Sequence, residues 1–135
     1  MEKIINSVNL TKIYGEKETS VTALDNITID FKENQFTAIM GPSGSGKSTL
    51  LHCLAGLDRP SSGEIFLRDQ DISTLNDKQL TKIRRDSFGF VFQAFNLIPT
   101  LTAEENITLP ASIAGRKPDM DWVKTCLLYT SDAAD

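Results

Sequence analysis

Residues 41–49 read GPSGSGKST, which is the spacing of a loop that binds phosphate groups, G-x-x-x-x-G-K-[ST]. The candidate phosphate-binding residues are Gly41, Ser43, Gly44, Ser45, Gly46, Lys47, Ser48 and Thr49. Glycines let the backbone adopt positive φ, so that successive N–H groups can turn inward around a polyphosphate. Lys47 would place a cation against the outer phosphates, and the Ser48 hydroxyl could ligate Mg²⁺. The pattern therefore predicts a site for a polyphosphate with magnesium.

The segments on either side of the loop support this interpretation. Residues 36–40 form a short apolar run that favours a buried parallel strand. Leucines follow the loop at helical spacing, at positions 50, 51, 54 and 57, and Gly56 is placed to cap that helix. The alternative, a flexible Gly-Ser linker, does not explain a strand before the loop and a helix after it.

Length and composition set the class of protein. The chain has 135 residues, 40% hydrophobic and 24% charged, which are ordinary values for a single globular domain. A net charge of −4 argues against a general attraction to nucleic acid. No apolar run is long enough for a membrane span, and no secretory signal is visible. Two cysteines without metal-ligand spacing agree with a reducing cytosol.

The last ten residues, 126–135, depart abruptly from the preceding pattern. Their sequence looks like the translated read-through of an adapter from a sequencing library. We therefore expect residues 1–125 to be the N-terminal part of a single domain and residues 126–135 to be a non-native tail. The alternative is a genuine frayed terminus.

Further elements can be predicted upstream and downstream of the loop. Residues 4–10 and 27–31 alternate as strands of a half-exposed antiparallel layer, with a polar loop at 15–20 between them. Asn34 sits in a turn and is the residue there best able to adopt a left-handed conformation. Residues 64–68 return to strand-like alternation.

The second half of the chain begins with a predicted helix and strand. Asn76 with Gln79 resembles a capping box, so a short helix is expected over residues 77–85. Residues 88–92 form the next predicted strand, and this strand delivers Gln93 at its end.

A second capping box opens the next predicted helix. Thr102 and Glu105 have the T-x-x-E spacing, and the helix would run through Ile107 and Leu109. Pro110 would kink this helix or end its first segment.

Three further motifs accompany the phosphate loop: Tyr14, the strand end at residues 90–93, and the segment LTAEENI at residues 101–107. With these motifs the chain resembles the N-terminal part of the ATP-binding subunit of ABC transporters, over residues 4 to about 124. Residues 95–102, together with residues 105–107, look most like the branch that serves macrolide export, lipoprotein release and antimicrobial-peptide resistance.

The resemblance implies a fold. We expect an α/β protein, a P-loop NTPase core with a central parallel sheet, an N-terminal antiparallel β layer and the start of a helical layer. The domain would be incomplete, because the 135 residues contain no L-S-G-G-Q signature, no apolar strand ending in Asp-Glu and no switch histidine. ATP hydrolysis is therefore expected of the intact parent protein and not of this chain alone. The single histidine, His52, is expected on the surface of the loop's helix, and Cys53 is expected to be buried.

The resemblance also implies roles for individual residues, with ATP and Mg²⁺ as cofactors. Tyr14 would stack on adenine, and residues 43–49 would hold the phosphates. Lys47 and Gln93 would act in catalysis, and Ser48 and Gln93 would hold Mg²⁺. Simpler alternatives remain open: Tyr14 could be an aromatic residue that ends a strand, and Gln93 an ordinary polar strand end.

Partners follow from the same resemblance. Transmembrane permease subunits would contact the loop near Phe95, Leu97 and Ile98, because apolar residues in a loop often mark a contact. The alternative is burial of these residues under the helical layer. A second copy of the subunit would complete a head-to-tail dimer, cytoplasmic and peripheral on the inner face of the plasma membrane, with no nucleic acid bound.

Two other functions were considered. One is a P-loop ATPase of the DNA-repair or chromosome type, which would carry a long heptad segment after its glutamine; residues 94–124 show no sustained heptads. The other is a non-catalytic module that binds a nucleotide. Binding of ATP together with release of phosphate would separate an enzyme from such a binder.

Overall fold

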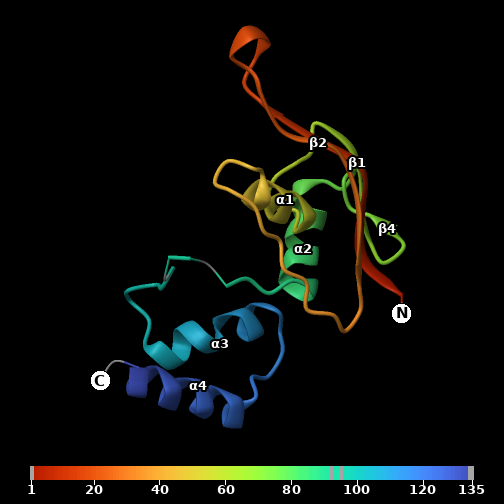
Figure 1. The fold of residues 1–135 in the computed structure, drawn as a ribbon. Coiled ribbons are helices and arrows are strands. Elements are labelled where there is room, and N and C mark those ends of the chain that lie inside the picture. The colour runs from red at the N-terminus through yellow and green to blue at the C-terminus, as the bar shows by residue number, and fades with distance from the viewer. Residues whose placement is uncertain (1, 92, 95, 134–135) are drawn as a thin grey trace. The chain divides into compact units, whose positions relative to one another are not determined.

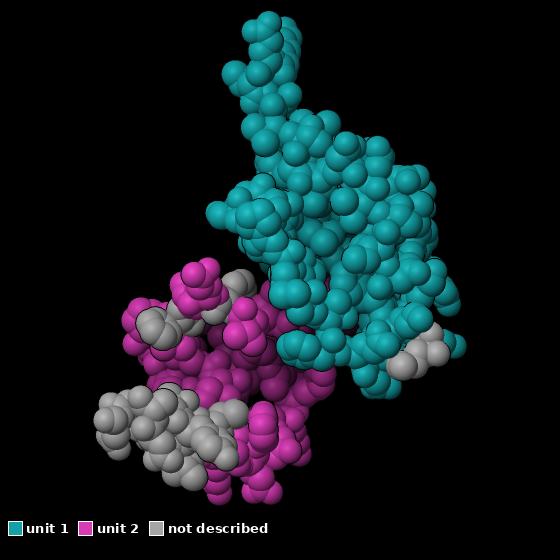
Figure 2. All heavy atoms as spheres, in the orientation of Figure 1, with its two compact units in different colours: residues 1–84 teal, residues 85–135 magenta. Residues whose placement is uncertain are grey.

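The computed structural model describes residues 2–91, 93, 94 and 96–133, of which 126 and 128–133 are described by their backbone alone. The chain divides into two compact units, Met1–Arg84 and Arg85–Asp135 (Figure 2). The phosphate loop belongs to the first unit and Gln93 to the second. Within the described residues, no helix is both long and apolar enough to cross a membrane.

The first unit is built on a four-stranded antiparallel sheet with the order β2-β1-β3-β4 (Figure 1). Its strands are β1 (Lys3–Tyr14), β2 (Val21–Lys32), β3 (Ser62–Leu67) and β4 (Gln70–Asp71). The predicted polar loop between the first two strands holds a short 3-10 turn, η1 (Lys17–Thr19). The predicted antiparallel layer is therefore confirmed, and its first two strands run further than the sequence pattern indicated.

A bulge in β1 sets which residues face the core. Ser7 pairs with Ile29 but Leu10 pairs with Ile27, so two residues of β1 stand opposite one residue of β2. Asn9 takes up the extra length at φ 50°, and its N–H donates to the Thr28 hydroxyl at 2.9 Å. A bulge of this kind shifts the alternation by one residue, which allows both Ser7 and Leu10 to be fully buried.

The core lies between this sheet and two helices, α1 (Lys47–Leu54) and α2 (Asp77–Ser87). Its buried members are Leu10, Leu24, Leu50, Cys53, Leu54, Ile65, Ile72 and Leu80. Removing each large apolar side chain from water contributes about 1.5–3 kcal/mol. The prediction that Cys53 is buried and His52 exposed is confirmed. These contacts hold α1, and with it the loop before α1, against the sheet.

The end of α1 follows the prediction made for Gly56. Gly56 has φ 74° and donates to the Cys53 carbonyl at 3.1 Å, and Leu57 donates to the His52 carbonyl at 2.9 Å. This pair of bonds is a Schellman motif, which a left-handed glycine makes possible. Arg84 donates to the Gly56 carbonyl at 2.6 Å, so its side chain stabilises the end of α1.

Two predicted parallel strands are not strands in this structure. Residues 36–40 have no strand conformation, and both Phe36 and Met40 are almost fully exposed. Residues 88–91 also lack it, and Phe92 lies outside the described residues. A parallel strand is stable only when neighbouring strands satisfy its backbone and cover its faces. No described strand pairs with either segment, so local apolar composition alone did not suffice.

The second unit contains α3 (Ala103–Ile113) and α4 (Met120–Ala133). The predicted capping box at the start of α3 is present, because Thr102 accepts from the Glu105 N–H and Glu105 accepts from the Thr102 N–H. The helix continues for three residues after Pro110, so this proline does not end it; the other predicted effect, a kink, stays a prediction. A proline removes one hydrogen bond, and the Ala114 N–H still reaches the Pro110 carbonyl at 3.1 Å.

Candidate functional site

The phosphate loop has the backbone that its glycines predict. Residues 43–46 turn sharply into α1, and Gly44 and Gly46 have φ values of 82° and 94°. A Cβ at Gly41 would lie 2.8 Å from the Ser45 hydroxyl oxygen, so a side chain there would fill the turn. Gly46 is the N-cap of α1 and has no side chain to accept the first helical N–H groups. Those donors remain available to an anion, which fits the triphosphate of ATP.

Lys47 lies over its own loop. Its ammonium group donates to the Gly41 carbonyl and to the Pro42 carbonyl, the latter at 2.9 Å. The positive charge is therefore held beside the glycine-rich turn that precedes α1. Ser48 is exposed on the first turn of α1, and Thr49 is half-buried beside it. Within the described residues, no group of three or more His, Cys, Asp or Glu side chains could bind a metal.

Tyr14 ends β1 and lies next to this helix. Its hydroxyl donates to Asp58 Oδ2 at 2.6 Å, and 41% of the residue is exposed. The hydrogen bond to Asp58, with some loss of hydration, raises the pKa of Tyr14, while a hydrogen bond with Thr49 opposes that shift. Tyr14 and Thr49, two residues of the predicted site that are 35 positions apart in the sequence, therefore lie close enough for Thr49 to influence the pKa of Tyr14.

Two residues that the sequence did not reveal surround this tyrosine. The Lys12 ammonium lies 5.0 Å from the centre of the Tyr14 ring and 3.1 Å from Asp58 Oδ1. The hydrogen bond from Tyr14 is the largest cause that lowers the pKa of Asp58; burial opposes it, and the hydrogen bond and charge of Lys12 lower the pKa further. Asp58 lies 44 residues from Tyr14 and follows the helix end, so no local pattern connects the two.

The remaining predicted site residues belong to the second unit. Gln93 is exposed in a bend, and Phe95 lies outside the described residues. Leu97 and Ile98 are 63% and 42% exposed in the turn before α3. Asn106 fixes this turn: its Oδ1 accepts from the Ile98 N–H at 2.8 Å, and its amide nitrogen donates to the Ile98, Leu101 and Thr102 carbonyls.

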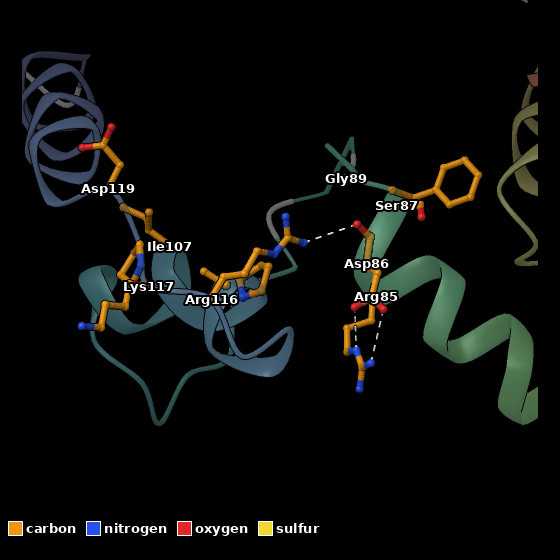
Figure 3. Close-up of a pocket in the computed structure, with 12 residues that line it drawn as sticks. Arg85, Asp86, Ser87, Gly89, Ile107, Arg116, Lys117 and Asp119 are labelled. Carbon is orange, nitrogen blue, oxygen red and sulfur yellow. Dashed lines mark hydrogen bonds and ion pairs between the residues drawn. The ribbon is translucent and has the colours of Figure 1, made fainter. Parts of the chain in front are cut away.

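The second unit also has a surface pocket of about 520 Å³ between the end of α2 and α3 (Figure 3). Arg85 pairs with Asp86 at its rim at 2.9 Å, and Arg116 donates to the Asp86 carbonyl at 3.4 Å. None of the residues predicted to bind ATP lines this pocket.

A glycine-rich turn at the start of a helix, with its lysine held over the turn, is the arrangement of P-loop nucleotide-binding proteins. The family model described as ABC transporter matches residues 24–133, and the chain belongs to this family.

Known relatives agree with this assignment. The chain is 51% identical, over 79% of its length and 46% of the relative's, to the ABC transporter ATP-binding protein MJ0796 of Methanocaldococcus jannaschii. It is 46% identical, over 85% of its length, to the macrolide export ATP-binding/permease protein MacB of Marinobacter nauticus, of which it covers 18%.

Solved structures give the same result for the fold. A dimeric post-hydrolysis structure of the cassette MJ0796 bound to ADP and Pi superposes with a TM-score of 0.80 at 46% identity. The match covers 91% of this chain and 54% of that one, so the chain spans about half the length of a cassette. The expected cassette fold, with its N-terminal antiparallel layer and the start of a helical layer, is thereby confirmed.

Proposed function

We propose that this chain is the N-terminal part of an ATP-binding subunit that powers an ABC transporter of the macrolide-export, lipoprotein-release or antimicrobial-peptide-resistance branch. The observation that carries the proposal is the geometry of the phosphate loop, where Gly44 and Gly46 have positive φ before α1 and Lys47 donates to the Pro42 carbonyl at 2.9 Å. The first N–H groups of α1 and the Lys47 ammonium are suited to phosphates, and the partly exposed ring of Tyr14 at the end of β1 is suited to a base. A magnesium nucleoside triphosphate needs all of these groups in one place.

In this proposal the main-chain N–H groups of residues 43–49 hold the phosphates. Lys47 leaves or shares its carbonyl partners and neutralises charge on the outer phosphates, which is where charge develops in phosphoryl transfer. Ser48 and Gln93 hold Mg²⁺, which supplies further neutralisation when bound. Positioning and neutralisation of charge are the main contributions that a protein makes to this reaction.

The proposed partners are permease subunits and a second copy of the subunit, arranged head to tail. Support for the first comes from Leu97 and Ile98, whose apolar side chains are exposed in a turn that Asn106 fixes. Support for the second comes from MJ0796, which has been solved as a dimer. A permease partner would place the subunit at the inner face of the plasma membrane. Hydrolysis and transport would be properties of the longer protein.

Equilibrium binding of ATP to the 135-residue chain tests the site, with and without Mg²⁺ and alongside a phosphate-release assay. Lys47→Ala should weaken binding about 10- to 100-fold, because bonds to charged groups contribute about 1.5–3 kcal/mol. Lys78→Ala is the matched control, since Lys78 is an exposed lysine on α2. Equal ATP affinity in the Lys47→Ala and Lys78→Ala chains would overturn the proposal.

A further inference from the structure

The side chain of Tyr14 is held by two charged residues that do not belong to the phosphate loop. Asp58 accepts a hydrogen bond from the Tyr14 hydroxyl at 2.6 Å, and the Lys12 ammonium lies over the ring, 5.0 Å from its centre. Lys12 also pairs with Asp58 at 3.1 Å and donates to the Arg59 carbonyl at 2.6 Å. The three side chains therefore form a closed set of contacts, and each one restricts the other two.

Burial separates these contacts from ordinary surface ion pairs. The side chain of Lys12 is only 14% exposed, and that of Asp58 is 34% exposed. In the exposed Lys3–Asp30 pair of the same sheet, by contrast, the two side chains are 54% and 41% exposed. A cation that is partly removed from water interacts more strongly with a ring and a carboxylate than one in solvent.

Asp58, which anchors Tyr14, is bonded to the helix that carries the phosphate loop. Asp58 follows the Schellman motif, and its N–H donates to the His52 carbonyl in α1 at 3.2 Å. Helix α1 thus carries the phosphate loop at its start and, through Asp58 just beyond its end, anchors the aromatic ring.

We propose that Asp58 and Lys12 are positioning residues that hold the Tyr14 ring where it stacks on the base of a nucleotide bound at the phosphate loop. This inference rests on the proposed function. A ring that is already ordered loses less side-chain freedom on binding, and an immobilised side chain is worth about 0.5–1.5 kcal/mol. The affinity gained this way concerns the base alone, because neither residue takes part in holding phosphates.

Calorimetry on the 135-residue chain can measure the affinity for ATP and for inorganic tripolyphosphate, which has phosphates but no base. Comparing the two affinities separates the contribution of the base from that of the phosphates. Asp58→Ala should weaken ATP binding about two- to tenfold. Its affinity for tripolyphosphate should equal that of the control variant Asp30→Asn. Asp58→Asn retains an acceptor for the phenol proton and should lose less affinity for ATP than Asp58→Ala. If Asp58 had a purely structural role, Asp58→Ala would lower the affinity for both ligands equally, and that result would overturn the inference.

Tyr14→Phe provides a second test that leaves Asp58 in place. It keeps the ring but removes the bond to Asp58, so it should reproduce the effect of Asp58→Ala on ATP. Combining the two changes should add nothing, since both remove the same interaction. Additive losses would contradict the inference. If the original chain binds neither ligand, or if Lys47→Ala changes neither affinity, the proposed function itself fails, and this inference with it.

Discussion

The backbone of Gly46 approaches the carbonyl oxygen of Ala23 so closely that a Cβ at position 46 would lie 2.5 Å from that oxygen. Ala23 belongs to β2, whereas Gly46 ends the phosphate loop and precedes α1. The second glycine of the motif therefore has a packing role in addition to its proposed role in binding phosphate. It allows the start of α1 to rest directly on the sheet.

Gly46→Ala should destabilise the chain more than Gly44→Ala. Both glycines have positive φ, which costs a residue with a side chain about 1–2 kcal/mol. Only Gly46 adds a collision, since a Cβ at Gly44 would meet nothing within 4 Å. Urea unfolding of the two variants measures the difference in free energy. Equal losses would show that the contact with Ala23 relaxes without cost.

The turn before α3 depends on Asn106, and the protection of the Ile98 amide hydrogen from exchange with solvent should show this. Asn106→Ala removes the acceptor of the Ile98 N–H and three donated bonds, so exchange of the Ile98 amide hydrogen should accelerate. Asn106→Asp keeps an acceptor for that N–H and should retain more of the protection. Hydrogen exchange read by NMR at Ile98 distinguishes the two variants. Unchanged exchange in Asn106→Ala would mean that other contacts fix the turn.

The caps of the helices could be predicted from the sequence because they are local. Asn76 and Gln79 exchange bonds of 3.1 and 2.9 Å, and Gly56 and Asn34 adopt the positive φ expected of them. Each of these features depends on residues within a few positions of one another. The spacing alone therefore fixed the geometry.

Features that depend on distant residues could not be predicted in this way. The run at residues 36–40 is apolar enough for a buried strand, yet strand formation needs neighbours that no described strand provides. The bond from Tyr14 to Asp58 joins residues 44 positions apart, and no pattern marks Asp58 as its partner. The approach of Gly46 to Ala23 is likewise visible only in the folded chain.

Stability should depend on Asp58 in a defined range of pH. Its pKa is lowered from the ordinary 3.8, first by the Tyr14 hydroxyl and then by Lys12. A lowered pKa contributes stability that is present above the ordinary value and is lost as the pH falls through the folded value. The difference in free energy of unfolding between the original chain and Asp58→Ala should therefore be constant near neutrality and shrink below about pH 4. A difference that grows on acidification would contradict this network.

The buried thiol of Cys53 should resist thiol reagents until the first unit opens. Burial, and then the carboxylate of Asp58, raise its pKa from 9.0 to about 11. Because the thiolate is the reactive form, a shift of about two pKa units lowers its population about 100-fold near pH 8. Because the pKa of Cys53 is raised, burial of the neutral thiol contributes stability below pH 9. This contribution to stability is lost as the pH rises towards 11.

Modification with a chromogenic disulfide in a Cys126→Ser chain measures the reactivity of Cys53 alone. The reaction should be at least about 100-fold slower in the native chain than in denaturant. Leu80→Ala should accelerate it, because Leu80 packs in the same core cluster and its truncation promotes opening. A native rate equal to that in denaturant would show that α1 does not cover this thiol in solution, and the helix that carries the phosphate loop would then lack the support described for it.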